Sequence, residues 1–271
     1  MDINSKLTFK KPLSLRRKLA KGLSNLRPLY KAAIVNEGTD MSEWLRDNYY
    51  LLEREGRSAL KSLKYSPALP HNGKNIPEIF LLCKKTVGED IEAAIRHEIE
   101  NSDRPITTQE LQSLPFMLKA SLVDTACICA KNRDEYSAEM MGLAITGLRS
   151  LPSIDFEQII EDYSQIEKIF SRDPSGAYTG MDEKTRAIYR SKCTELALRK
   201  KCDEAQVAEN IVKLAQSASK SRERHIGFYL LEDTSKSRRI RGNIFLTLRF
   251  IIPLIVSFII SCFSHAYWLI P

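Results

Sequence analysis

The sequence predicts an all-α fold, a multi-helix cytoplasmic domain followed by one C-terminal transmembrane helix. Apolar residues recur at spacings of three and four along most of the chain, and helix-capping pairs precede several of these runs. A convincing alternating strand pattern is missing, with 225–231 as the one possible exception. The 271 residues, 43% hydrophobic and 28% charged, are enough to bury a sizeable core.

The first segment, 1–35, is strongly basic and amphipathic. Residues 1–31 hold nine Lys or Arg against the single Asp2. Apolar positions Leu15, Leu19, Leu23 and Leu26 follow helical spacing and predict a helix that ends near Pro28. Two interpretations stay open: the helix lies on the cytoplasmic leaflet of a membrane, or it docks on the body with a solvated basic face.

The range 36–233 is expected to form a helical cytoplasmic domain. Helices are predicted over 41–60, 77–100, 107–115, 116–130, 135–148, 155–170 and 203–215. The stretch 64–75, rich in Pro, Gly and Asn, is expected to be a loop and a hinge.

Three of these helices carry an N-terminal capping signal. Thr107, Asp155 and Asp203 are each followed three residues later by Glu or Gln, the spacing of a capping box. Pro115 is expected to stop or kink the helix that begins after Thr107. The range 155–170 is expected to be one continuous helix with an apolar face that belongs to the core.

The C-terminal part predicts a membrane anchor. A basic linker, 234–249, leads into the 22 uncharged residues of Phe250–Pro271, in which a transmembrane helix is expected over 250–270. Four arginines that precede this stretch predict that the bulk of the chain stays on the cytoplasmic side: Arg238, Arg239, Arg241 and Arg249. We therefore expect a single-pass protein of a bacterial inner membrane, with the lipid bilayer as a partner. The alternative is a buried core helix.

Patterns typical of enzymes are incomplete. The stretch 142–149 has the two glycines of a phosphate loop but lacks its Lys and Ser/Thr, so small-residue helix packing explains it better. His97 begins a zinc-protease pattern that has no second histidine. The six cysteines form no C-x-x-C pair and are expected to be free, buried thiols. We predict no catalytic, cofactor-binding or metal-binding residue, and no nucleic-acid partner.

The stretch DPSGAYTGMDEKTRAIYR, 173–190, has two possible interpretations. Asp173 and Asp182 resemble the paired carboxylates of a hydrolase, with Arg172, Arg186, Tyr178 and Tyr189 around the same turn. The favoured interpretation is a helix-loop-helix junction. In it the Asp-Pro pair ends one helix, Gly176 and Gly180 supply positive φ, and Asp182 caps the next helix.

Four ordered blocks resemble the N-terminal region of bacterial cyclic β-1,2-glucan synthases. The stretch 151–197 is similar to a family segment in which a helix ends in a "DPAGVY" turn and continues as "MDFATRDRYR". DNYYLLERE from Asp47, LPFMLKASLVD from Leu114 and RHIGFYLLED from Arg224 resemble other blocks of the family, in the same order. Within the turn, these residues carry the resemblance, without an assigned role: Asp173, Pro174, Gly176, Tyr178, Met181, Asp182, Arg186, Tyr189 and Arg190.

The resemblance implies a link to the synthesis of periplasmic cyclic glucan. In the family, this region precedes a membrane segment and a glucosyltransferase domain that uses UDP-glucose, with glycoside hydrolase or phosphorylase-like domains beyond. UDP-glucose and a divalent metal are thus expected only for that transferase domain. We expect this chain to be a truncated or separately encoded scaffold region, inactive alone, that partners a glucosyltransferase domain or subunit. The alternative is a C-tail-anchored helical adaptor with no glucan role.

Overall fold

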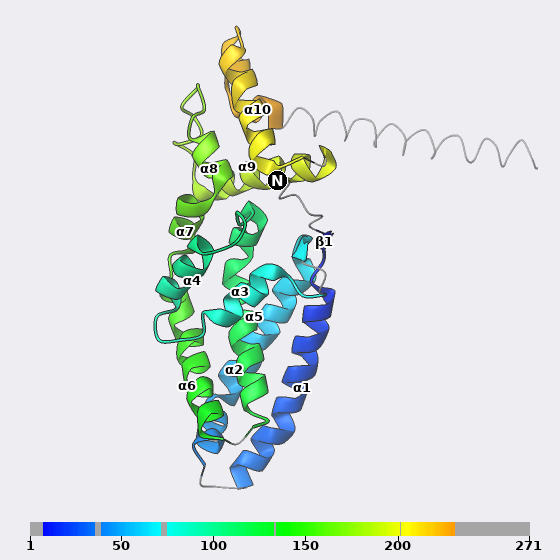
Figure 1. Ribbon diagram of the computed structural model, residues 1–271, viewed down its shortest axis with the longest axis vertical. Helices are drawn as coiled ribbons and strands as arrows, with labels where there is room; N and C mark the ends of the chain where they lie inside the picture. The colour runs from blue at the N-terminus through cyan, green and yellow to red at the C-terminus, as the bar shows by residue number, and fades with distance from the viewer. Residues whose placement is uncertain (1–7, 36–38, 72–74, 133, 201, 231–271) are drawn as a thin grey trace, which may run out of the picture. The chain divides into compact units, whose positions relative to one another are not determined.

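The computed structural model describes residues 8–35, 39–71, 75–132, 134–200 and 202–230 (Figure 1). They divide into two compact units. Unit 1 comprises the described residues up to Lys168, and unit 2 those from Ile169 onward. The range expected as one helical domain, 36–233, therefore contains parts of both units.

Unit 1 is mostly helical. Its elements are β1 (Thr8–Lys10), α1 (Leu13–Val35), α2 (Asp40–Tyr65), β2 (Leu69–His71), α3 (Glu78–Lys85), α4 (Ile91–Glu100), α5 (Thr108–Cys129), α6 (Glu135–Ser150), η1 (Leu151–Ser153) and α7 (Phe156–Tyr163), and α8 (Gln165–Phe170) spans the boundary to unit 2. The range 77–100, expected as one helix, forms the separate helices α3 and α4.

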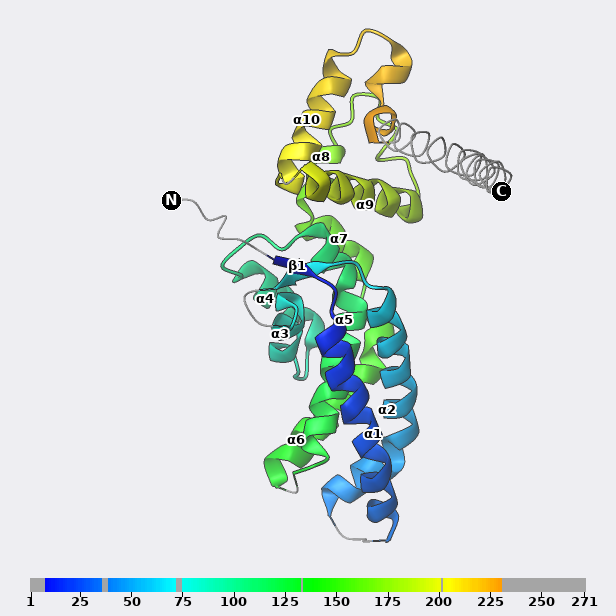
Figure 2. The ribbon, with the colours of Figure 1, turned by 90° about the vertical axis from the view of Figure 1, so that its right-hand side faces the viewer.

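Helix α5 is the centre of unit 1. It packs against α1, α2, α3, α6 and α7, and Figure 2 shows it behind α1 and beside α2. Leu114, Leu118 and Leu122 are fully buried. The helices predicted over 107–115 and 116–130 form one helix, so a stop at Pro115 is wrong, while the kink that was the other expectation stays a prediction. Burial on nearly every side of α5 stabilises the helix enough to offset the hydrogen bond that proline removes.

Helix α1 is docked on the body of unit 1. Leu15, Leu19 and Leu26 are 0–1% exposed and belong to the hydrophobic core. The helix continues past Pro28 to Val35, so the end predicted at Pro28 is also wrong. The leucine face is therefore used for packing within the protein, as the docked interpretation requires.

The all-α expectation holds only as a mostly helical fold. Strands β1 and β2 pair antiparallel, with Phe9 opposite Pro70 in register. Because β2 lies within the expected loop 64–75, this stretch is partly a strand. Among the helices that the structure describes, none combines the length and apolar character needed to cross a bilayer. The expected span 250–270 and the linker 234–249 lie outside the described residues.

Ser164 divides the range 155–170 into two helices, where one was predicted. It caps the C-terminus of α7 with extended backbone (φ −72°, ψ 120°). Its buried hydroxyl bonds Thr108 Oγ1 at 3.1 Å and accepts the Glu167 N–H at 3.3 Å. A polar side chain inside an otherwise regular apolar pattern thus ends one helix and begins the next.

The capping predictions have different outcomes. Thr107 and Glu110 form a reciprocal capping box, and Asp155 accepts the Gln158 N–H at 3.0 Å, so both predictions are confirmed. Asp203 occupies the N-cap of its helix without a side-chain cap bond.

Glycines in α6 allow close helix packing, as the sequence indicated. A Cβ at Gly142 would lie 2.9 Å from Trp44 Cζ2, and one at Gly147 would lie 3.0 Å from Leu122 Cδ2. The stretch 142–149 is accordingly an interior helix face rather than a phosphate loop.

Unit 2 is smaller and also helical. Its elements after α8 are α9 (Glu183–Lys200), α10 (Glu204–Ser217) and η2 (Ser221–Arg224). Residues 226–230 are helical, so the strand considered for 225–231 is not formed.

The described cysteines are free; four are buried, but Cys202 is exposed, against the expectation of buried thiols throughout.

Candidate functional site

The loop 171–182 joins α8 to α9 in unit 2 and contains the turn that the sequence singled out. Gly176 has a φ of 68°, the left-handed conformation that glycine tolerates best. Gly180 is not among the described glycines with positive φ, so that part of the prediction is wrong. Asp182 accepts the Thr185 N–H at 2.7 Å and caps the first turn of α9, as predicted.

Asp173 is the centre of the polar contacts in this loop. Its side chain is fully buried, and its carboxylate accepts hydrogen bonds from Ser175 Oγ at 2.5 Å and from the Ile226 N–H at 3.3 Å. Its Oδ2 also lies 3.1 Å from His225 Nδ1. Burial alone would raise the pKa of Asp173, but the hydrogen bonds from Ser175, His225 and Ile226 leave it below its usual value.

His225 connects Asp173 to α9. Its Nδ1 faces the carboxylate, and its Nε2 lies 3.1 Å from the hydroxyl of Tyr189. Burial and the negative charge of Asp173 raise the pKa of Tyr189, which keeps the phenol protonated and able to donate to Nε2. Gly227 makes this approach possible, because a Cβ there would lie 2.7 Å from His225 Nε2.

The arrangement contains the residue types of a Ser-His-Asp triad but not its geometry. In a triad the carboxylate orients one imidazole nitrogen while the serine faces the other. Here Ser175 Oγ and Asp173 both lie beside Nδ1, at 3.2 and 3.1 Å. Nε2, the nitrogen that would remove a proton, faces Tyr189 instead. The cluster therefore fixes the loop and does not activate Ser175 as a nucleophile.

Aromatic and charged side chains complete the support of the loop. Tyr178 is fully buried, with its ring 5.4 Å from that of Phe170 and 6.0 Å from that of Tyr189. Arg190 is fully buried and pairs with Glu183. Glu183 also pairs with Arg186 at 3.3 Å. Ion pairs and ring contacts thus hold the side of α9 that follows the turn.

The other residues of the predicted turn are not part of the polar cluster around Asp173. Pro174 is half-buried, and the Met181 N–H donates to the Tyr178 carbonyl at 3.1 Å, which closes the loop before α9. Arg172 pairs with Glu209 of α10 rather than with the turn. Asp173 and Asp182 have different partners, so the paired-carboxylate interpretation gains no support from their contacts.

The crest of the loop is exposed while its ends are anchored. Five residues are exposed: Ser175, Gly176, Ala177, Thr179 and Gly180. Between them Tyr178 points into the core. The crest thus has small exposed side chains on a loop held by buried anchors, and loops positioned by a rigid scaffold often carry binding residues.

His225 and Ser175 are the site residues that sequence reasoning missed. His225 lies 52 positions from Asp173, and it was interpreted as one scattered histidine among four. The available signal was its position in the block RHIGFYLLED, one of the blocks that carry the family resemblance.

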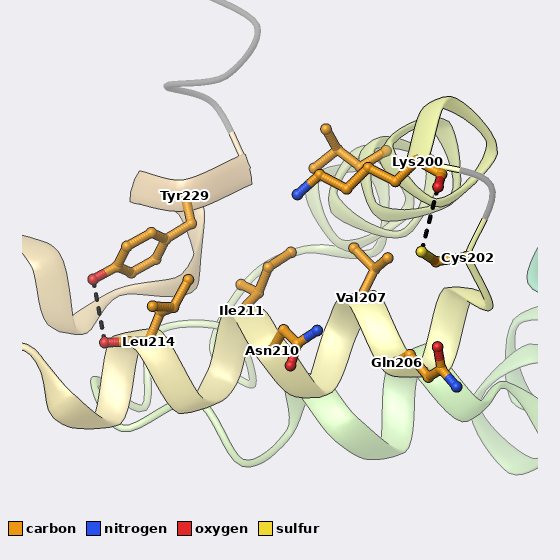
Figure 3. A pocket seen from close by; sticks show the side chains of 9 residues that line it. Lys200, Cys202, Gln206, Val207, Asn210, Ile211, Leu214 and Tyr229 are labelled. Atoms are coloured by element: carbon orange, nitrogen blue, oxygen red, sulfur yellow. Dashed lines mark hydrogen bonds between the residues drawn. The ribbon is translucent and has the colours of Figure 1, made fainter.

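A small cavity of about 290 Å³ lies between α9, α10 and the segment that carries Tyr229 (Figure 3). Its lining is Leu196, Lys200, Cys202, Gln206, Val207, Asn210, Ile211, Leu214 and Tyr229. The Tyr229 hydroxyl donates to the Leu214 carbonyl at 3.2 Å, as Figure 3 shows.

Across the part of the chain that the structure describes, no three His, Cys, Asp or Glu residues gather as metal ligands would.

The topology residues Arg238, Arg239, Arg241 and Arg249 lie outside the described residues. Comparison with protein-family models gives no match, and no curated protein matches the sequence.

Proposed function

We propose that this chain is the membrane-anchored, cytoplasmic scaffold region of a cyclic β-1,2-glucan synthase-like protein. In this proposal the exposed crest 175–180 contacts a glucosyltransferase domain that uses UDP-glucose. The observation that carries the proposal is that the four blocks resembling this family contact one another in pairs.

In unit 1, the blocks from Asp47 and Leu114 meet through an ion pair. Lys119 Nζ on α5 lies 2.7 Å from Glu55 Oε2 on α2. The contact is half-buried, with side-chain exposures of 26% and 15%. Residues 64 positions apart in the sequence therefore form one contact, which supports a shared role for the two blocks in this fold.

In unit 2, the other two blocks meet at the polar cluster. Asp173 and Tyr189 belong to the block with the DPSGAY turn, and His225 belongs to the block from Arg224. The residues that carry the resemblance are thus the ones that shape the loop. This supports a structural role for the sequence pattern, which is to hold the loop in one geometry.

A docking role fits the chemistry of the loop better than catalysis does. His225 Nε2 faces a protonated phenol, Asp173 is buried, and the exposed crest offers small side chains and backbone groups. The uncharged stretch 250–270 and the four arginines before it support a position beside a membrane-bound transferase.

The proposal is tested by reconstituting the full chain with the glucosyltransferase domain of a cyclic β-1,2-glucan synthase in lipid nanodiscs. We expect the two to copurify. Ala177→Arg changes the exposed crest without removing an anchor, and it should weaken the complex by about tenfold, as for a residue inside an interface.

Ser219→Arg is the matched control, because it adds the same charge at another exposed position of unit 2. It should leave the complex unchanged, and circular dichroism should show equal helix content in both variants. Equal weakening by both variants, or no complex with the wild type, would contradict the proposal and favour a helical adaptor without a glucan role. Turnover of UDP-glucose by the chain alone would contradict the scaffold role.

A further inference from the structure

The outward face of α1 in unit 1 is basic from residue 16 to residue 31. At 100° per residue, its exposed cations fall within an arc of about 140° opposite Leu15, Leu19 and Leu26. These cations are Arg16, Arg17, Lys21, Arg27 and Lys31, and all five are exposed. Helix α1 contains no Asp or Glu. We call these five residues the basic face. Figures 1 and 2 show that α1 lies at the surface of unit 1.

The basic face is free of ion pairs within the described residues. Lys18 lies outside the arc of these five cations. Its Nζ pairs with Asp124 Oδ2 at 2.8 Å, so Lys18 is not counted in the basic face. The five cations span 15 positions, about 22 Å at 1.5 Å per residue. Exposed Lys10, the last residue of β1, and exposed Lys11 lie shortly before α1 and add to the positive charge. A row of uncompensated cations repels itself and favours an anionic partner.

The partner must bind from outside without displacing the helix. The leucine face is fully buried in unit 1, so insertion of α1 into an apolar phase would require unit 1 to open. The exposed large apolar residues of this helix lie at its ends: Leu13 at one, and Ile34 and Val35 at the other. The binding is therefore electrostatic.

We propose that the basic face binds the anionic headgroups of a lipid bilayer and orients unit 1 on its surface. A flat array of negative headgroups fits cations that lie on one side of one helix. The inference rests in part on the anchor of the proposed function, since tethering to the same bilayer raises the effective concentration of headgroups. Each Lys or Arg beside an anionic leaflet strengthens binding by about fivefold.

The experiment uses the full chain in nanodiscs of phosphatidylcholine, with or without phosphatidylglycerol. Ser24→Cys places a fluorophore in the middle of the basic face, and Cys202→Ser with Cys262→Ser removes competing thiols. Headgroup spin-labelled lipid quenches the fluorophore when α1 lies on the surface. We expect at least about twofold stronger quenching with the anionic lipid, and loss of the difference at high salt, where exposed charges are screened.

Two variants with equal charge loss make the test specific. The first changes all five residues of the basic face to Gln. The second changes five other exposed cations of unit 1 to Gln: Arg54, Arg57, Lys61, Lys64 and Lys131. Quenching in anionic nanodiscs should fall to the phosphatidylcholine level in the first variant and persist in the second.

Equal quenching in both lipids, or equal loss in both variants, would overturn the proposal. Binding of a DNA or RNA duplex that needs the basic face, without lipid-dependent quenching, would overturn it in favour of nucleic acid. Failure of the anchor is a separate result, because the chain then does not copurify with nanodiscs. Quenching by added anionic vesicles would in that case still test α1.

Discussion

Units 1 and 2 differ in the kind of their largest fully buried side chains. The largest fully buried side chains of unit 1 are Phe80 and a set of Leu and Ile residues, whereas those of unit 2 include Arg190 and Tyr178. Unit 1 has one continuous apolar core around α5. Unit 2 also buries apolar residues of α9 and α10, and its loop is held by a carboxylate, a histidine, a phenol and a buried guanidinium.

The difference indicates that the buried side chains of unit 1 mainly supply stability, whereas the polar contacts of unit 2 fix the geometry of one loop. Apolar burial is not directional, so a core of leucines tolerates small shifts and mainly supplies stability. Polar contacts act only at defined distances and angles, and buried polar groups are costly when a partner is lost. The polar contacts of unit 2 therefore hold the loop in one geometry, and the stability of the loop depends on each polar partner.

The largest effect is expected in the core of unit 1. Leu118 is fully buried in α5, and Leu118→Ala should lower the free energy of unfolding of unit 1 by about 3 kcal/mol through lost burial and a cavity. Trp268→Phe leaves Trp44 of unit 1 as the single tryptophan, so its fluorescence during urea unfolding measures the change.

Leu81→Ala is the control, because Leu81 is 37% exposed and should cost about 1 kcal/mol or less. Hydrogen exchange in unit 2 should not change in either variant. Faster exchange in unit 2 after Leu118→Ala would contradict the expectation that the loop of unit 2 depends on its own polar contacts and not on the core of unit 1.

A smaller effect is expected from the carboxylate of unit 2. Asp173→Asn removes the negative charge of the carboxylate that contacts Ser175 Oγ and His225 Nδ1. This should destabilise the loop by about 2 kcal/mol. Hydrogen exchange of peptides from 173–190 and 225–230 measures the loss, and unit 1 should be unaffected. Asp182→Asn is matched in chemistry, but Asn caps a helix as well as Asp does, so it should leave the stability of the loop nearly unchanged. Equal losses in both variants would refute a special role for Asp173.

The smallest effect concerns pH. Because folding lowers the pKa of Asp173, its charge contributes stability above the pKa of an unfolded Asp, about 3.9, and this contribution is lost as the pH falls through the folded pKa. The difference in stability between the wild type and Asp173→Asn should be constant near neutral pH and shrink below about pH 4. Hydrogen exchange corrected for intrinsic rates measures it. A difference that stays the same in acid would mean that the carboxylate is not the stabilising form.

Prediction from the sequence succeeded where contacts are local. The caps at Thr107, Asp155 and Asp182 connect residues three apart, so their spacing alone predicted them. It failed at Pro115 and Pro28, because the burial of α5 and α1 offsets the cost of proline and burial depends on distant segments.

The candidate site was predicted only in part. The turn was recognised by its residues, and Gly176 was assigned correctly to positive φ. The partner of Asp173 was not predicted, because His225 follows two helices later and nothing in its immediate neighbours marks it. The break at Ser164 was missed for the same reason, since its hydroxyl bonds Thr108, 56 positions away.

The sequence by itself determined the mostly helical character, the local caps, the basic charge of the first helix and the uncharged C-terminal stretch, because each depends on neighbouring residues. Only the tertiary structure decided that the leucines of α1 face the core and leave its cations outside. It also decided that Asp173 bonds His225, with Ser175 on the wrong nitrogen for a catalytic triad. These outcomes depend on contacts between segments that are far apart in the sequence. Composition and residue spacing alone do not predict such contacts.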